Sequence, residues 1–272
     1  MGTARWLEVG DRVYCRRYQP WDVTVGVVRG SDGVLVIDTR ASHRQADDLR
    51  DDLRGLDRRP PLWVVNTHWH FDHTFGNARF LPAQLWGHVS LPHMLATRGG
   101  EAAPEEEDGT TVTPPDHLID ERATLDLGDR AVDIRHLGRG HTDGDLVVSV
   151  PGAGVMFAGD LVEESGPPAY GDDSFPLEWP ATNARLVGVL RAADRVVPGH
   201  GAVVDRAFVF SQLRGLEAVA RTIRRLWVGE VPQGAALAAG EGQWPWPATV
   251  LADAVARGYR ELDVSAERGS GG

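Results

Sequence analysis

One short segment of the chain, residues 67–73 (THWHFDH), combines three histidines with an aspartate. His68 and His70 stand two positions apart, so an extended backbone would point both imidazoles to the same side. Asp72 and His73 follow, and a turn at this point would aim them at a second centre nearby. Neutral imidazole and carboxylate are the ligands that zinc takes where no thiolate is available. The segment therefore predicts a metal site.

Three further candidate ligands follow predicted strands later in the chain, each beside a glycine: His141 in GRGHTDGD, Asp160 in FAGD and His200 in PGHG. Glycine next to a ligand lets the backbone turn sharply and leaves space at a metal. Seven candidate ligands are more than one tetrahedral zinc can use, so the set predicts two divalent cations. The other five histidines, which we expect to have no catalytic role, are His43, His88, His93, His117 and His136.

Alternating β-rich and helical patterns must position these ligands. The expected strands are 12–18, 23–29, 34–38, 62–67, 123–127, 131–136, 145–150, 155–158 and 195–197, with one more strand and a helix within 81–98. The other expected helices are 42–56, 180–193, 206–228 and 248–261. Residues 99–115, which are acidic and rich in Gly and Pro, are expected to form an exposed loop.

This pattern predicts two strand-rich halves, each closed by helices. Such a pattern is typical of an α/β fold in which two mixed β-sheets pack face to face with helices outside. We expect residues 1–205 to form this metal-binding domain. Residues 206–272 are expected to form a helical extension packed on it, with a disordered tail from residue 267.

Composition excludes several other classes of protein. The net charge of the 272-residue chain is −11, without a basic run, which argues against nucleic acid as a partner. Cys15 is the single cysteine, so neither an intrachain disulfide nor a thiolate cage can form. The first residues lack the pattern of a signal peptide, and no stretch approaches the roughly 18 apolar residues of a membrane span. We expect a cytoplasmic protein that acts on a small molecule and not on a membrane, and the oligomeric state stays open.

The order of the ligand motifs, H-x-H-x-D-H, then G-H-T, G-D and G-H, resembles the metallo-β-lactamase superfamily over residues 12–204. The resemblance implies an αββα sandwich with a dinuclear site at one edge of the sheets. The implied ligands are His68, His70 and His141 for a first metal, Asp72, His73 and His200 for a second, and Asp160 as a bridge. The implied cofactors are two Zn²⁺ per chain, with Mn²⁺ or Fe²⁺ as alternatives. Asp160 and Asp72 would also be catalytic, by fixing the two metals and orienting a bridging hydroxide.

The superfamily hosts hydrolysis of β-lactams, lactones, thioesters and phosphodiesters as well as oxygen chemistry, so the fold alone does not give the substrate. Asp160 stands where antibiotic-destroying members carry Cys or Ser, and is typical of glyoxalase II-like, lactonase-like and ribonuclease Z-like members. N-acyl homoserine lactonases carry a Tyr three residues later, where this chain has Glu163, which argues against that activity. The resemblance therefore implies a zinc-dependent hydrolase of an acyl bond (ester, thioester, lactone or β-lactam) in a small molecule.

Two alternatives stay open. One is a mononuclear iron oxidoreductase that resembles persulfide dioxygenases, which use two His and an Asp from the same motifs. The intact second set of ligands favours the dinuclear hydrolase over it. The other is a phosphodiesterase or nuclease, which the negative charge of the chain disfavours.

The segment 167–179 follows the third motif closely and carries Tyr170, Phe175 and Trp179 among Gly, Pro and Asp. A loop of this length after a metal ligand often covers a site. The three aromatic residues are therefore candidate substrate contacts. The competing interpretation is that they only pin the loop to the edge of the sheet.

Two other groups of polar residues have both a functional and a structural interpretation. Thr142 and Asp143 could orient ligand imidazoles, or they could form a turn. In glyoxalase II relatives a helical C-terminal region binds glutathione with basic residues. Here Arg221, Arg224 and Arg225 are expected to form a solvated helix face instead.

Overall fold

The structure, a computed structural model, describes residues 5–99 and 109–270. The strands are β1 (Leu7–Gly10), β2 (Val13–Tyr18), β3 (Val23–Arg29), β4 (Val34–Ile37), β5 (Trp63–Val65), β6 (Gln84–His88), β7 (His117–Ile119), β8 (Arg122–Asp126), β9 (Ala131–His136), β10 (Leu146–Val150), β11 (Val155–Glu163), β12 (Arg195–His200) and β13 (Val204–Asp205). The helices are α1 (His43–Leu56), α2 (Phe71–Thr74), α3 (Leu91–Arg98), α4 (Trp179–Val189), α5 (Arg206–Val228), α6 (Gln233–Ala239) and α7 (Ala252–Ser270), with 3₁₀ turns at Asn77–Phe80 and Ala248–Val250.

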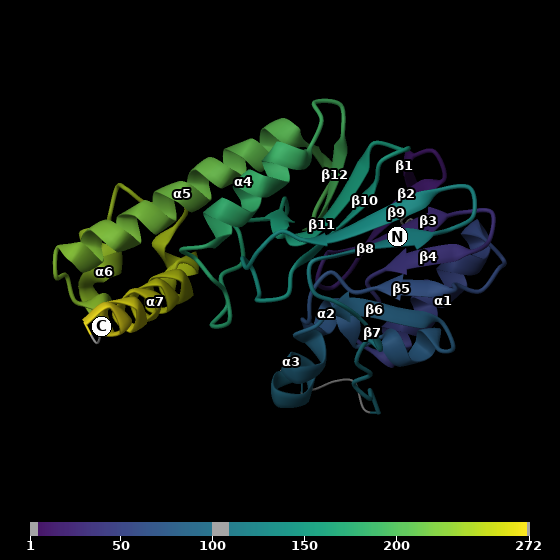
Figure 1. Cartoon of the computed structure of the whole chain (residues 1–272), viewed down its shortest axis with the longest axis horizontal. Helices are drawn as coiled ribbons and strands as arrows, with labels where there is room; N and C mark the ends of the chain where they lie inside the picture. The colour runs from purple at the N-terminus through teal and green to yellow at the C-terminus, as the bar shows by residue number, and fades with distance from the viewer. Residues whose placement is uncertain (1–4, 100–108, 271–272) are drawn as a thin grey trace.

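The strands form two mixed halves that meet at one seam (Figure 1). In the first half, β2, β3 and β4 pair antiparallel, and β4, β5, β6 and β7 pair parallel. In the second half, β11 and β12 pair parallel, while β8, β9, β10 and β11 pair antiparallel. The seam consists of a single backbone pair, His200 of β12 with Val23 of β3. The two predicted sheets are therefore joined along one edge.

Three layers of apolar side chains separate the elements. The middle layer packs one half of the sheet on the other, with Leu35 and Ile37 facing Val148 and Phe157 in one cluster. A second layer lies between α1 and the outer face of the first half. A third lies between the outer face of the second half and α4 and α5, and it continues between α5 and α7. The αββα sandwich is confirmed.

Helix α1 shows how local sequence produces one of these layers. The side chain of Ser42 accepts a hydrogen bond from the backbone N–H of Gln45 at 3.2 Å and caps the helix. Ala46, Leu49 and Leu53 then recur at helical spacing and are buried against the sheet. The charged residues between them face solvent, so the helix can cover only this surface.

The C-terminal helices share a core with the second half of the sheet. Helix α5 begins at Arg206, where the extension was predicted, and it runs beside α4 (Figure 1). Leu213 and Leu216 of α5 belong to the same apolar cluster as Val162 of β11. Helix α7 continues through Ser270, so the chain is helical at residues 267–270, where a disordered tail was expected. None of the described helices is both long and apolar enough to cross a membrane.

The remaining differences from the sequence-based expectation are local. Strand β11 continues past the predicted end at residue 158, so that Asp160 lies inside a strand and not after one. Three short strands, β1, β7 and β13, and the short helices α2 and α6 were not predicted. Much of the expected loop 99–115, residues 100–108, lies outside the described residues.

Candidate metal centre

The seven predicted ligands converge near the seam between the two halves. They come from the segment after β5 (His68, His70), from α2 (Asp72, His73), from the loop after β9 (His141), from β11 (Asp160) and from the end of β12 (His200). Their ligand atoms form one group of His68, His70, His141 and Asp160, and a second group of Asp72, His73 and His200; within each group all lie within 4.8 Å of one another. The structure thus gathers the same two sets that the resemblance implies.

The spacing of the imidazole nitrogens suits a shared cation. His70 Nδ1 lies 2.8 Å from His141 Nε2 and 3.1 Å from His68 Nε2. His73 Nε2 lies 3.4 Å from His200 Nε2. Two nitrogens that each bind zinc at about 2.0–2.1 Å in a tetrahedron lie about 3.3 Å apart. The distances between imidazole nitrogens within each group are therefore close to those expected around a bound zinc ion.

Asp160 joins the two groups. Its Oδ2 lies 3.5 Å from His141 Nε2 and 3.7 Å from His68 Nε2, both in the first group. The same oxygen lies 3.3 Å from His200 Nε2 of the second group. The other oxygen, Oδ1, lies 3.3 Å from His73 Nε2 and is buried without a hydrogen-bond partner. Buried carboxylates need a compensating charge, and a cation in each group would supply it, so the residues present fit a pair of metal ions.

Hydrogen bonds on the far side of the rings fix which nitrogen faces the centre. His141 donates from Nδ1 to the carbonyl oxygen of Ala169 at 2.9 Å, and His200 donates from Nδ1 to that of Trp21 at 2.8 Å. In each ring this leaves Nε2 with its lone pair toward the cluster. Metal-binding histidines are commonly held in this way.

Asp38, at the end of β4, positions the ligand segment and was not predicted from the sequence. Its Oδ2 accepts a hydrogen bond from His73 Nδ1 at 2.8 Å, and its Oδ1 accepts one from the backbone N–H of Thr67 at 2.8 Å. Asp38 is 1% exposed and adopts φ +66°, a left-handed conformation that is costly for a residue with a Cβ. The one signal in the sequence was its place at the end of the predicted strand 34–38, which does not indicate the histidine that it contacts.

Asp173, in the segment 167–179, holds His70 from the opposite side. Its Oδ2 accepts hydrogen bonds from His70 Nε2 at 3.1 Å and from Trp69 Nε1 at 2.8 Å. This leaves Nδ1 of His70 facing the cluster. The segment thus contacts the site through the carboxylate of Asp173. The sequence had indicated only its aromatic residues as candidates.

Burial and neighbouring charges move the pKa values of these histidines in opposite directions. Burial lowers the pKa of His68 well below its usual range and that of His141 to about 4, which keeps both rings neutral, as metal binding requires. Burial also disfavours charge on His73, but Asp160 and other nearby carboxylates raise its pKa to about 9. Burial alone would raise the pKa of Asp160, but neighbouring imidazoles hold it well below the usual value.

The three aromatic candidates occupy different environments. Tyr170 lines the hollow above the ligands. Trp179 is fully buried, with its ring edge-on to Tyr170 at 5.1 Å and to His141 at 5.7 Å between centroids, so it packs beneath them. Phe175 lies between two guanidinium groups, Arg139 at 4.3 Å and Arg257 at 5.2 Å from its centroid. Substrate contact by Tyr170 or Phe175 is not tested by the structure, and the two guanidinium contacts favour a structural role for Phe175.

Thr142 and Asp143 form a turn. The hydroxyl of Thr142 donates to Asp145 at 2.7 Å, and Asp145 also accepts from the backbone N–H of Thr142. Asp143 accepts a hydrogen bond from Ser90 at 3.0 Å. Of the two interpretations given above, turn formation is the one that the structure supports.

The ligand atoms open onto a hollow of about 380 Å³. This volume lies within the range of sites for small molecules, roughly 300–1,000 Å³. The hollow is lined by His70, Asp72, His141, Asp160, Glu163, Ser165, Ala169, Tyr170, Gly171 and His200. A small substrate can therefore approach the cluster directly from solvent.

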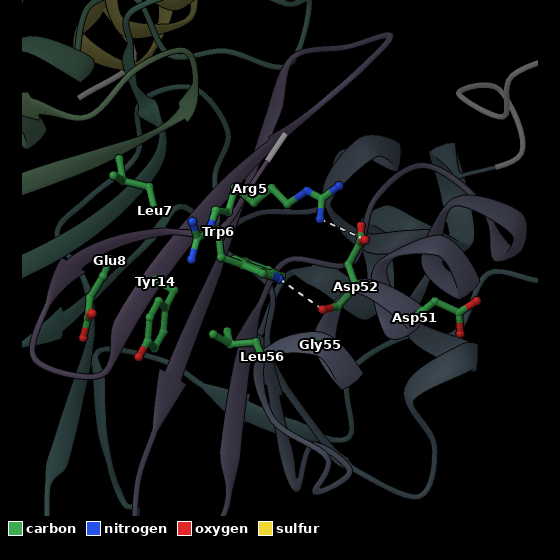
Figure 2. Close-up of a pocket in the computed structure, with 10 residues that line it drawn as sticks. Arg5, Trp6, Leu7, Glu8, Tyr14, Asp51, Asp52, Gly55 and Leu56 are labelled. Atoms are coloured by element: carbon green, nitrogen blue, oxygen red, sulfur yellow. Dashed lines mark hydrogen bonds and ion pairs between the residues drawn. The ribbon is translucent and has the colours of Figure 1, made fainter. Parts of the chain in front are cut away.

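A larger hollow, of about 810 Å³, lies elsewhere, between β1, β2 and α1 (Figure 2). Three of its polar residues are paired with one another: Arg16 Nη1 lies 2.8 Å from Asp52 Oδ1, and Trp6 Nε1 donates to the carbonyl oxygen of Asp52 at 3.2 Å. None of the candidate metal ligands lines it. Size alone therefore does not identify the reaction centre, and we assign that role to the smaller hollow.

Comparison with known proteins defines the family. The model of the metallo-beta-lactamase superfamily matches residues 18–200, and the chain belongs to this superfamily. It is similar to a metallo-beta-lactamase type 2 from Bacillus sp. (strain 170), with 25% identity over 190 residues, 69% of this chain and 70% of that protein. It is also similar to a hydroxyacylglutathione hydrolase from Erythrobacter litoralis (strain HTCC2594), with 32% identity over 135 residues, 48% of this chain and 47% of that protein.

A solved structure shows the same fold. A metallo-beta-lactamase from Pontibacter korlensis has a TM-score of 0.67 to this chain at 20% sequence identity, and the match covers 79% of this chain and 99% of that one. The superfamily consists mostly of metal-dependent hydrolases. The His and Asp clusters described above are the residues of this chain that could hold such metal ions.

Proposed function

We propose that this protein is a hydrolase that holds two Zn²⁺ ions and cleaves an acyl bond (ester, thioester, lactone or β-lactam) of a small molecule. The observation that carries the proposal is the position of Asp160, one carboxylate within 3.7 Å of histidine nitrogens from both ligand groups. A single metal would leave one group of buried carboxylate and imidazole without a cation. Two metals account for all seven ligands.

The chemistry follows from what this donor set can hold. Two divalent cations in such a site lower the pKa of water and polarise the acyl oxygen under attack. Asp160 would fix the spacing between the two positions, and Asp72, whose Oδ2 lies 3.3 Å from His200 Nε2, would help to orient the attacking water. Asp38 and Asp173 hold His73 and His70 in place, so that the site needs little rearrangement.

Two observations support acyl transfer over phosphoryl transfer. Two relatives of the chain are named as a metallo-beta-lactamase and a hydroxyacylglutathione hydrolase. In addition, the hollow is lined by the carboxylates Asp72, Asp160 and Glu163 and by no arginine or lysine among the described residues. Phosphate-binding sites are usually basic, so an uncharged acyl group is the better fit.

A substrate panel tests the proposal. Protein stripped of metal and then loaded with Zn²⁺ or Mn²⁺ is assayed on a β-lactam, a lactone, a thioester, an aryl ester and a phosphodiester, with metal content measured on the same samples. We expect about two metals per chain and turnover of at least one acyl substrate, lost on chelation and restored by metal. Asp160→Ala is the negative control, and His117→Ala, outside the site, is the matched control.

Other results would point to a different reaction. One iron per chain, with oxygen consumption on a persulfide, would identify the mononuclear oxidoreductase. Turnover of the phosphodiester alone would replace acyl hydrolysis with nuclease-like chemistry. Metal content that never exceeds one equivalent after reconstitution would overturn the dinuclear centre.

A further inference from the structure

Glu163 lies beside the cluster, although neither its sequence motif nor the family resemblance makes it a ligand. Its carboxylate forms a third group with Asp160 and His200, with ligand atoms within 4.8 Å of one another. The residue is 6% exposed, yet it lines the hollow above the ligands. It therefore faces the cluster from a buried position at the end of β11.

An irregularity in β11 explains why Glu163 and Asp160 face the same site. Residues three apart on a regular strand point to opposite faces. Here the pairing of β11 with β12 shifts: Gly159 is opposite Pro198, and Glu163 is opposite His200, so four steps on β11 match two on β12. Gly159 adopts φ +54°, and the extra residues after it form a bulge. The bulge brings both carboxylates to the metal side.

The Glu163 carboxylate has no hydrogen-bond or ion-pair partner within residues 5–99 and 109–270. The hydrogen bond that Glu163 makes with a side chain comes from its backbone, whose N–H donates to the side-chain oxygen of Gln212 at 3.0 Å. A buried carboxylate without a partner is costly, and a second carboxylate nearby, Asp160, adds to the cost. A cation between Glu163, Asp160 and His200 would remove both penalties.

We propose that Glu163 is a further ligand at the second metal position, which gives that position a third carboxylate beside Asp72 and Asp160. The inference rests on the proposed metal centre. Carboxylate oxygen suits harder cations such as Mn²⁺ better than imidazole does, whereas zinc accepts both. The additional oxygen ligand therefore raises the affinity of this position for Mn²⁺ more than for Zn²⁺.

Metal titration of the full-length chain tests this inference. Apo protein is titrated calorimetrically with Mn²⁺ alone and with Zn²⁺ alone, for the wild type, Glu163→Gln and Glu164→Gln. The control residue Glu164 carries the same charge in the next position, but its carboxylate accepts a hydrogen bond from the backbone N–H of Ala202 at 2.6 Å. For Glu163→Gln we expect the affinity for Mn²⁺ at the second metal position to fall about tenfold or more, as loss of a group around a metal commonly causes. We expect a smaller change for Zn²⁺, and none for Glu164→Gln.

The melting temperature of the apo protein separates a ligand from a merely structural residue. Replacing a buried, unpaired carboxylate with a neutral amide should raise the melting temperature of apo Glu163→Gln, while metal binding weakens. If Glu163 had a merely structural role, its replacement would lower both the melting temperature of the apo protein and the affinity for metal. If the variant does not fold, anomalous diffraction from wild-type crystals soaked in Mn²⁺ decides the question, with a Glu163 oxygen expected about 2.0–2.2 Å from the ion.

Three outcomes would count against the inference in different ways. Unchanged Mn²⁺ affinity in Glu163→Gln, or a Glu163 oxygen outside bonding distance in the crystals, overturns the role of Glu163 and leaves the metal centre intact. An equal loss of affinity for Mn²⁺ and Zn²⁺ in Glu163→Gln overturns the proposed effect of Glu163 on the preference for Mn²⁺. Wild-type protein that takes up no metal overturns the proposed function itself.

Discussion

The carboxylate of Asp173 and the imidazole of His70 lie 3.1 Å apart although 103 positions separate them in the chain. The contact joins the loop after β11 to the ligand segment after β5. Because Asp173 also accepts a hydrogen bond from Trp69, it fixes both the orientation of His70 and the backbone next to it. The loop 167–179 is therefore part of the support of the metal centre.

Replacing Asp173 with Ala should weaken metal binding at the first position by about 10–100-fold, since partners of metal-bound histidines contribute on this scale. Competition with a chromophoric chelator measures the affinity. Asp172→Ala is the matched control, because Asp172 is exposed and, among the described residues, its side chain pairs with Arg98 and with no metal ligand. Equal affinities for the wild type and Asp173→Ala would show that His70 is held adequately without this carboxylate.

Replacing Asp160 with Ala should remove both metals and most activity, because this residue contacts histidines of both groups. Several kcal/mol of transition-state stabilisation correspond to a loss of about a thousandfold in kcat. Elemental analysis and kinetics on the same preparation measure both effects. A variant that keeps two metals and near-normal turnover would mean that the bridge has been misassigned.

Replacing Tyr170 with Leu should raise KM and leave the metal content unchanged, because Tyr170 lines the hollow but is outside both ligand groups. The substrate found in the panel is the one to use. A variant with wild-type KM but a lower melting temperature would assign Tyr170 to packing on Trp179 instead.

Replacing Phe175 with Ala should lower stability and leave kcat/KM unchanged. The ring lies between Arg139 and Arg257, and each cation–π contact contributes about 0.5–1 kcal/mol at a partly exposed site. The expected loss is therefore about 1–2 kcal/mol, measured by chemical denaturation. A rise in KM without a loss of stability would restore Phe175 as a substrate contact.

Glu261 of α7 should make stability depend on pH. Burial raises its pKa from 4.5 to about 7, although Arg257 opposes the shift. The folded state then binds the proton more tightly than the unfolded state. The contribution of Glu261 to the free energy of unfolding is therefore fully present below pH 4.5 and is lost as the pH rises through 7. Glu261→Gln should be more stable than the wild type at pH 8, by on the order of 1 kcal/mol because the group is partly screened by solvent.

Denaturation curves at pH 4 and pH 8 measure the effect of this change. The advantage of Glu261→Gln should vanish at pH 4, where both side chains are neutral in the folded state. Glu217→Gln, a control on the surface of α5, should show a much smaller difference between the two pH values. An advantage of the same size at both pH values would exclude titration of Glu261 as the cause.

Local sequence was sufficient for most of the fold. Strands such as β3 and β9 and helix α5 have the predicted bounds, because alternation and helical spacing are properties of neighbouring residues. The ligand motif was equally local, so His68 to His73 could be identified directly. Strand β11 was predicted too short, since its continuation through Asp160 depends on pairing with β12.

The supporting residues could not be identified in this way. Asp38 and Asp173 reach their histidines across 35 and 103 positions, and nothing near them in the sequence indicates the partner. Thr142 and Asp143 adjoin a ligand, but proximity in sequence is a poor guide here because the side chain of Thr142 bonds to Asp145 and that of Asp143 to Ser90. Contact with a ligand depends on how the two halves of the sheet meet, which a single sequence does not encode locally.

The single backbone pair between Val23 and His200 has a consequence for how the protein unfolds. Four of the seven ligands belong to the first half of the sheet and three to the second, so each of the two cations would be bound by residues of both halves. The metal centre would then cross-link the halves in addition to the apolar layer and to hydrogen bonds such as that of Thr24 with Gly201. Cations that bind only while the two halves are together stabilise the folded domain. The affinity for the cations and the resistance of the halves to separation are therefore thermodynamically linked. Mutation of a metal ligand should therefore lower the cooperativity with which the whole domain unfolds, as well as its activity.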